Sequence, residues 1–303
     1  MKIFVVSVYA LQSAGSQTAI SSSGAETIDF SETSLAVKTV DAHFGYQWRL
    51  VRHYRLDWIK ILLMPNELTK VFVGYDSRED IAWQVCRHSL LRHANNELAV
   101  IPLRQPVLRE LGLYTRQHDA GASTEFSLTR FLAPYLAAQS GWVIFCDCDF
   151  LFTGDVRDVL EGLDPAKAVY CVQHDYSPAY QFKMDGKKQV AYPRKNWSSF
   201  MVFNCDHPDV KALTPDVVNS ASPAFLHRFE WMADPSAIGA LDPEWNFLEG
   251  EYPKPAKTPR VIHYTNGGPW FEEWQHCDYA ELWVEERALY LEASGKARLP
   301  QAA

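Results

Sequence analysis

The chain has 303 residues, of which 47% are hydrophobic, and it carries a formal net charge of −8 with a sequence pI near 5.7. This length and composition suit a globular protein with one large domain, or one domain plus an extension. The acidic balance argues against a protein that coats nucleic acid, because phosphate-binding surfaces are usually basic. No nucleic-acid partner is therefore expected.

Residues 1–66 are expected to form an N-terminal extension that is either poorly structured or contains a short basic helix. A Ser/Thr/Ala-rich tract over residues 12–34 predicts loop. Residues 49–66, RLVRHYRLDWIKILLMPN, interleave basic and apolar side chains. Such a helix either packs on the following domain or makes a peripheral contact with a membrane. Met64 offers a start for that domain, so residues 1–63 are predicted to be dispensable or not to be part of the native protein.

Residues 67–300 read as one α/β domain. Strands are predicted at KVFVGYD (70–76), LAVIPL (98–103) and GWVIFCDCD (141–149). Helices are predicted between them, at SREDIAWQVCRHSLLRHA (77–94) and at STEFSLTRFLAPYLAA (123–138). Alternating strands and helices predict a Rossmann-like, mostly parallel sheet flanked by helices, which binds ligands at the carboxyl ends of its strands.

The second half of the domain is less regular. Strands are predicted within AVYCVQHD (168–175), SSFMVFNC (198–205) and RVIHYT (260–265), which makes the sheet mixed. The six cysteines contain no CxxC pair, so reduced thiols and a cytoplasmic location are expected. No apolar run reaches the roughly 18 residues that span a bilayer.

Two acids interrupt the apolar run GWVIFCDCDFLFTGD, over residues 141–155. Burying an ionised carboxylate without a partner costs on the order of several kcal/mol. A compensating charge is therefore expected beside Asp147 and Asp149. Side chains alternate along a strand, which places both acids on one face. Mn²⁺ or Mg²⁺, which prefer oxygen ligands and often bind phosphate oxygens as well, would supply that charge.

Other protein classes also carry Asp-x-Asp after a strand. A phosphatase of the haloacid-dehalogenase type needs Ser or Thr two residues after the second acid, where this chain has Leu151. A nucleotidyltransferase usually starts with a Gly-rich basic loop, which VFVGYDSRED lacks. A non-catalytic protein that binds a nucleotide sugar remains an alternative to an enzyme.

Taken in order, five features resemble the nucleotide-sugar glycosyltransferases of the A-type fold: an acid that ends the first strand, a helix arginine, the Asp-Cys-Asp motif, TGDV and His-x(5)-Pro-Trp. The resemblance covers residues 70–275 and is greatest to family 8, a retaining group that includes glycogenin and lipopolysaccharide galactosyl- and glucosyltransferases. It implies a hexosyltransferase that takes a nucleotide sugar, with UDP-sugar as the expected donor, and a glycan or lipid-linked saccharide as acceptor. An alternative reading as a phosphatase or a binding protein stays open.

The same resemblance implies roles for individual residues. Asp76 would contact the nucleotide base, although it could equally cap the helix that begins at Ser77. Arg130 would hold the nucleotide and diphosphate, although it could equally be an arginine on the helix surface. Asp147 and Asp149 would bind the metal and the ribose, and His263 would complete the metal shell.

The segment after His263 departs from the family pattern. Family members carry Lys directly before Pro-Trp, where this chain has Gly268. Another cation would therefore contact the diphosphate, or the amides of Gly267 and Gly268 would take over more of this contact. Trp270 could stack on sugar or base, or belong to the core.

The acids that would assist catalysis are less marked. The family's Asp-Gln-Asp segment is absent, and Asp234 in WMADPSAIGALDPEWNFL takes its place in chain order. Asp242 and Glu244 in the same stretch are further candidates for the catalytic carboxylate. Ser198 and Ser199 either line the sugar pocket or pack as an ordinary strand.

Overall fold

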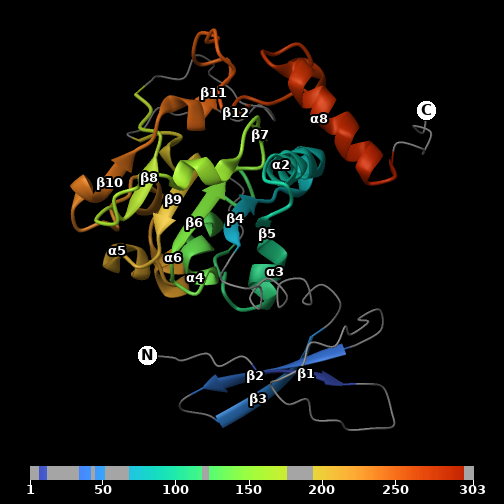
Figure 1. Ribbon diagram of the computed structural model, residues 1–303. Helices are drawn as coiled ribbons and strands as arrows, with labels where there is room; N and C mark the ends of the chain where they lie inside the picture. Colours follow the sequence, from blue (N-terminus) through green and yellow to red (C-terminus); the bar gives the residue numbers. More distant parts are fainter. Residues whose placement is uncertain are drawn as a thin grey trace. The chain divides into compact units, whose positions relative to one another are not determined.

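Figure 1 shows the computed structural model of the chain, which divides into two compact units, Met1–Met64 and Pro65–Ala303. Each unit is described by itself. The structure describes the backbone of residues 7–11, 34–41 and 45–51, and both backbone and side chains of residues 68–117, 123–175 and 194–296.

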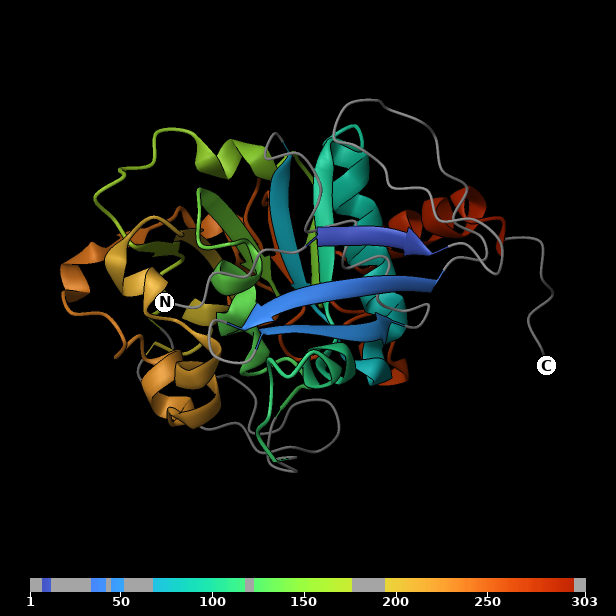
Figure 2. The ribbon, with the colours of Figure 1, turned by 90° about the horizontal axis from the view of Figure 1, so that it is seen from below.

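The first unit contains a three-stranded antiparallel sheet. Its strand order is β1 (Ser7–Leu11), β2 (Ser34–Asp41) and β3 (Gly45–Val51), drawn in blue in Figures 1 and 2. Residues 49–51 therefore lie in a strand, where the sequence predicted the start of a basic helix. The rest of that predicted helix, and most of the Ser/Thr/Ala-rich tract, lie outside the described residues.

The second unit is built on a six-stranded mixed sheet, which confirms the predicted α/β fold. Its order is β10-β8-β9-β6-β4-β5, and β4 pairs in parallel with both β5 and β6. β9 runs antiparallel to β6 and β8, and β10 is parallel to β8. The strands are β4 (Thr69–Gly74), β5 (Leu98–Leu103), β6 (Trp142–Cys146), β8 (Val169–Cys171), β9 (Phe200–Asn204) and β10 (Ile238–Ala240).

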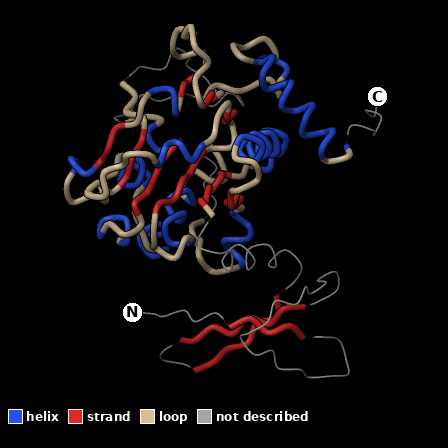
Figure 3. The backbone as a smooth tube through the Cα atoms, viewed as in Figure 1, coloured by secondary structure: helices blue, strands red, loops and turns tan. Residues whose placement is uncertain are grey.

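The central strands are buried because their residues are apolar on both faces. Val71 and Val73 of β4, and Ile144 of β6, are fully inaccessible to solvent. Near-continuous apolar runs of this kind are typical of strands covered by helices on both sides. Figure 3 shows the helices bordering the strands.

The helix α2 (Asp80–His93) follows β4 and packs beside β4 and β5, as Figure 2 shows. The helix predicted over residues 123–138 is much shorter. Residues 123–128 form turns, and only the 3-10 helix η3 (Thr129–Leu132) and α4 (Ala133–Leu136) follow. Pro134 lies in the first turn of α4, where its missing N–H is tolerated, and it would interrupt a longer helix through this position.

A second, three-stranded sheet lies beyond the end of β6. Its order is β11 (Phe247–Leu248), β12 (Val261–His263) and β7 (Phe150–Phe152), with β12 parallel to β11 and antiparallel to β7. β7 starts four residues after β6 ends. This short sheet therefore brings the segment that contains His263 to the carboxyl edge of the main sheet.

The remaining helices are short apart from the last one. They are α3 (Gln105–Glu110), α5 (Pro208–Lys211), α6 (Pro215–Ser220), α7 (Pro223–His227) and α8 (Ala280–Ala293). Glu286 attaches α8 to α2, because its buried carboxylate accepts hydrogen bonds from Arg92 and contacts His88 Nδ1 at 2.6 Å. None of the helices in the part of the chain that the structure describes is both long and apolar enough to cross a bilayer.

All six cysteines are free, and all except Cys277 are buried. Burial raises the pKa of the Cys146 and Cys148 thiols well above the usual range, and it raises the pKa of Cys205 to about 12. For Cys277, burial and the nearby charge of Glu249 raise the pKa to about 12 as well. The reactive thiolate form is therefore scarce at neutral pH.

We expect these thiols to react slowly in the folded protein. At pH 7 an aromatic disulfide reagent should modify at most the half-buried Cys277 within minutes, and all six thiols after unfolding in guanidinium. Counting the released chromophore with time measures both stages. Rapid reaction of two or more thiols in the folded protein would show that the cysteines of the sheet are more accessible than their burial indicates.

Candidate metal and nucleotide site

Asp147 and Asp149 lie in the bend between β6 and β7, at the carboxyl edge of the main sheet. The backbone fixes both residues: the N–H of Asp147 donates to the carbonyl of Ser199 at 3.0 Å, and the N–H of Tyr264 donates to the carbonyl of Asp149 at 2.9 Å. The intervening Cys148 is buried. The acids therefore leave the core at the predicted edge of the sheet, but they lie in a bend after Cys146 and not inside the strand predicted over residues 141–149.

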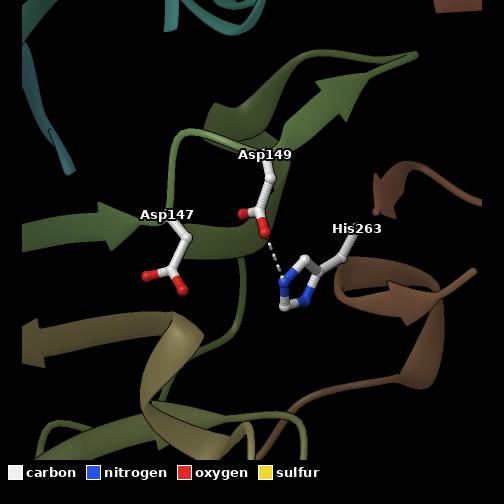
Figure 4. A group of neighbouring side chains, drawn as sticks. All are labelled: Asp147, Asp149 and His263. Atoms are coloured by element: carbon white, nitrogen blue, oxygen red, sulfur yellow. Dashed lines mark ion pairs between the residues drawn. The ribbon is translucent and has the colours of Figure 1, made fainter. Parts of the chain in front are cut away.

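His263 approaches the acids from β12, as Figure 4 shows. It pairs with Phe150 across the small sheet, and the two rings stack with centroids 4.3 Å apart. Its Nε2 lies 3.4 Å from Oδ2 of Asp149. One potential ligand atom from each of Asp147, Asp149 and His263 lies within 4.8 Å of the other two.

The three side chains suit a divalent cation. Carboxylate oxygens are the ligands that Mg²⁺ and Mn²⁺ prefer, and imidazole is a common ligand of transition metals. Their ligand atoms converge at a distance that one ion can bridge. The cluster is thus compatible with a divalent metal, and its chemistry leaves the identity of the ion open.

Arg130 neutralises part of the acidic pair. Its Nη1 lies 2.9 Å from Oδ1 of Asp147, and the guanidinium also donates to the carbonyls of Ser127 and Ser198. The side chain is 6% exposed. Arg130 is therefore a buried cation that holds Asp147 in place, and it offsets one of the two carboxylates.

Asp76 occupies the helix-capping position that the sequence left as an alternative. It is fully buried, it caps the 3-10 helix η2 (Ser77–Glu79), and its carboxylate accepts from the side chain of Arg78 and from the backbone N–H of Glu125. Burial acts to raise the pKa of Asp76, but these hydrogen bonds outweigh it and hold the pKa below the usual value. A contact with a nucleotide base stays a prediction.

The hydroxyl groups of Ser198 and Ser199 are both engaged inside the protein. Ser198 Oγ lies 2.8 Å from Nδ1 of His227, and Ser199 Oγ donates to the carbonyl of Asn196 at 2.7 Å. Burial, with a further contribution from Arg130, lowers the pKa of His227 to about 3, so this imidazole is neutral at physiological pH. The carbonyls of the two serines accept from Arg130 and from the N–H of Asp147, and a contact of either serine with a sugar stays a prediction.

The loop after His263 needs its glycines. A Cβ on Gly268 would lie 2.0 Å from the Trp270 ring, and Gly267 has a φ of +125° with Trp274 against it. Trp270 itself packs on Tyr264 and Trp283, with ring centroids 5.9 and 5.4 Å away. This packing matches the core alternative for Trp270 and brings the loop backbone close to the indole rings.

The predicted catalytic acids lie outside the metal-ligand cluster. Asp234 and Asp242 each cap a 3-10 helix, and Glu244 forms ion pairs with Arg260 at 3.2 Å and Lys257 at 3.4 Å. Asp242 and Glu244 do line a pocket of about 550 Å³, together with residues that include His174, Phe247 and Tyr252.

Two buried side chains near the site, His174 and Asn246, were not predicted from the sequence. Burial, helped by His263, lowers the pKa of His174 to about 3, and its Nδ1 contacts the Tyr252 hydroxyl at 3.1 Å. Asn246 is fully buried and contacts Nδ1 of His263 at 2.9 Å. The signal for Asn246 was its place two residues after Glu244, in a segment already marked for its acids.

Comparison with models of known protein families finds no match. Protein CDI from Arabidopsis thaliana is 47% identical over 225 residues, which cover 73% of this chain and 86% of that protein. The chain belongs to the family of Protein CDI. This relationship covers most of both proteins.

Solved structures share the fold of this CDI-family protein at low identity. The bifunctional glycosyltransferase WbbM aligns with a TM-score of 0.54 and 16% identity over 77% of this chain, which spans about half (52%) of WbbM. The apo form of the glycosyltransferase GlyE from Streptococcus pneumoniae TIGR4 gives 0.50 and 16%, over 77% of this chain and 64% of GlyE. The second unit thus has an A-type glycosyltransferase fold, which leaves membership of family 8 as a prediction.

Proposed function

We propose that this CDI-family protein is a metal-dependent glycosyltransferase that moves a hexose from a nucleotide diphosphate sugar, with UDP-sugar as the expected donor, to a hydroxyl of a glycan or lipid-linked saccharide. The observation that carries the proposal is the convergence of Asp147, Asp149 and His263. The cluster lies at the carboxyl edge of a sheet whose fold is that of glycosyltransferases, which is where such sheets bind ligands.

The residues of the cluster have separable tasks. Asp149 and His263 would hold Mn²⁺ or Mg²⁺. Arg130 fixes Asp147, so that the Asp147 carboxylate stays beside the other two ligands. A bound divalent ion supplies Lewis-acid neutralisation of the charge that develops on the departing nucleoside diphosphate. The backbone amide of Gly268 would add a donor for the diphosphate, whereas the N–H of Gly267 already donates to the carbonyl of Tyr264 at 3.0 Å.

The acceptor is proposed to enter the pocket lined by Asp242, Glu244 and Tyr252. Aromatic rings and carboxylates suit a saccharide, because the rings cover apolar sugar faces and the acids accept from hydroxyl groups. Transfer with retention follows the family resemblance. Asp234, Asp242 and Glu244 stay the candidate catalytic carboxylates, and the six free thiols support the proposed cytoplasmic location.

Thermal unfolding with a panel of nucleotides tests the proposal. The protein is unfolded with UDP, GDP, CMP or UDP-sugars, each with Mn²⁺ or with EDTA. A nucleotide at about one hundred times its dissociation constant should stabilise the fold by about 2.7 kcal/mol. We expect this stabilisation with UDP or a UDP-sugar and Mn²⁺, and its loss with EDTA.

The outcome also selects the donor. The UDP-sugar that stabilises most becomes the labelled donor for a search among saccharide acceptors. Absence of a metal-dependent shift with every nucleotide would contradict the glycosyltransferase proposal. Stabilisation without transfer to any acceptor, and without hydrolysis of the donor, would instead identify a non-catalytic nucleotide-sugar-binding protein.

A further inference from the structure

Asn246 is a fully buried amide that touches the candidate metal ligand His263 without belonging to the ligand cluster. It lies between the 3-10 helix η8 (Pro243–Trp245) and β11. Its side chain extends between His263 on one side and Asn196 and Ser199 on the other. A buried amide with partners on both sides has a fixed orientation, because each end must find a complementary group.

The partners on the far side decide which end of the amide faces His263. Nδ2 of Asn246 lies 2.9 Å from Ser199 Oγ and 3.4 Å from the carbonyl oxygen of Asn196. A carbonyl oxygen only accepts hydrogen bonds, and Ser199 already gives its hydroxyl proton to that same carbonyl. Both positions therefore require a donor, so the NH₂ end of Asn246 faces them and Oδ1 faces His263.

The orientation of Asn246 in turn selects the ring nitrogen of His263 that carries a proton. Oδ1 of Asn246 lies 2.9 Å from Nδ1 and can only accept, so Nδ1 must donate. On the opposite side of the ring, Nε2 lies 3.4 Å from the Asp149 carboxylate, which would also accept a proton. Asn246 and Asp149 thus compete, and the shorter contact is the one to Asn246.

We propose that Asn246 is a positioning residue that keeps the proton on Nδ1 of His263 and so leaves the Nε2 lone pair for a cation shared with Asp149. The inference rests on the metal site of the proposed function. Without the Asn246 acceptor, Nε2 would carry the proton and form a hydrogen bond with the Asp149 carboxylate. Nε2 would then have no lone pair for a cation, and the carboxylate oxygen would be engaged by the ring. Histidines that bind metals commonly donate their other N–H to a fixed acceptor in this way.

Two substitutions separate this role from simple packing. Asn246→Leu keeps a side chain of similar size but removes the acceptor for Nδ1. Asn246→Asp keeps an acceptor at the same place and loses the donor to Ser199. If Asn246 served only as a packing or anchoring group, the aspartate variant would behave like the leucine variant or worse, because it also places a carboxylate near the Asn196 carbonyl.

The first readout needs no metal. Long-range ¹H–¹⁵N correlation spectra of the metal-free protein at pH 8 report the protonation of each histidine ring nitrogen, and His263→Gln assigns the His263 signals. We expect a proton on Nδ1 of His263 in the unsubstituted protein and in Asn246→Asp, and on Nε2 alone in Asn246→Leu. Nε2 alone protonated in the unsubstituted protein, or no change in Asn246→Leu, would overturn the proposal.

The second readout is Mn²⁺ affinity, followed by the electron paramagnetic resonance signal of the free ion. Loss of an acceptor behind a metal-binding histidine typically weakens binding about 10- to 100-fold, so Asn246→Leu should lose this much and Asn246→Asp much less. Equal affinity in all three proteins would overturn the positioning role. If the unsubstituted protein bound no Mn²⁺ while Nδ1 of His263 carried the proton, the proposed metal site would be wrong. The role of Asn246 in fixing the proton on Nδ1 would still be supported.

Discussion

Asp149→Asn is expected to abolish the metal-dependent stabilisation by nucleotide and to lower transferase activity on the order of a thousandfold or more. The asparagine keeps an oxygen near His263 but removes the negative charge that attracts a divalent ion. Lewis-acid assistance is worth several kcal/mol, and each 1.36 kcal/mol corresponds to about tenfold in rate. Thermal unfolding with UDP and Mn²⁺ measures the binding loss, and transfer from the selected donor measures the rate.

Folding should survive this substitution. Asp149 is side by side with Asp147 in a bend held by backbone hydrogen bonds, so removing one of two like charges does not leave a new unpaired ion. With EDTA the variant and the unsubstituted protein should unfold at similar temperatures. Asp206→Asn is the matched control, because Asp206 is 62% exposed and accepts a backbone hydrogen bond that asparagine can also accept. An Asp149→Asn protein that kept its Mn²⁺-dependent shift would contradict the assigned ligand set.

The sheet could be predicted from the sequence because its signals are local. The runs that became β4, β5 and β6 are short, apolar and bounded by polar residues, and their order with α2 requires parallel pairing. Placing Asp147 and Asp149 at the carboxyl edge followed from the same information. Their approach to His263 was not visible in spacing alone, since it depends on β12 pairing with β7 across more than one hundred residues, and the family resemblance supplied it.

What the sequence could not provide is the set of side-chain partners. The pattern of residues 123–138 favoured a helix, but turns replace its first six residues and Pro134 limits the rest. Asp76 is held by Arg78 and Glu125, and Arg130 pairs with Asp147, while the nucleotide contacts that the resemblance implies for them stay predictions. Such pairings depend on tertiary contacts that no local pattern encodes.

The contact between Asn246 and His263 also depends on tertiary structure that the sequence does not reveal. It is separated from His263 by 17 residues and meets it because β11 and β12 pair in parallel, with Leu248 opposite His263. The amide could be located only after that register was known. The proposed proton position on His263, a candidate metal ligand, therefore depends on the register of a two-residue strand.

Arg130→Met should destabilise the folded protein by about 3–5 kcal/mol, the usual cost of removing one partner of a buried ion pair. The methionine fills much of the same space, so the loss comes from leaving the Asp147 carboxylate, 13% exposed, without its guanidinium. The carbonyls of Ser127 and Ser198 also lose a donor. Urea unfolding at pH 7 without metal measures the change.

Two further proteins show whether the charge on Asp147 is the cause. In the double variant Arg130→Met with Asp147→Asn the unpaired charge is gone, so part of the lost stability should return and the two changes should not add. Lys211→Met removes an exposed partner, 47% exposed and 3.9 Å from Asp206, and should cost at most about 1 kcal/mol. If Arg130→Met lowered the free energy of unfolding as little as Lys211→Met, solvent or other groups of the site would have to compensate the charge of Asp147. Arg130 would then be available to a bound diphosphate. A large loss that the second substitution relieves would establish that Arg130 compensates the charge of Asp147 in the protein without metal or nucleotide.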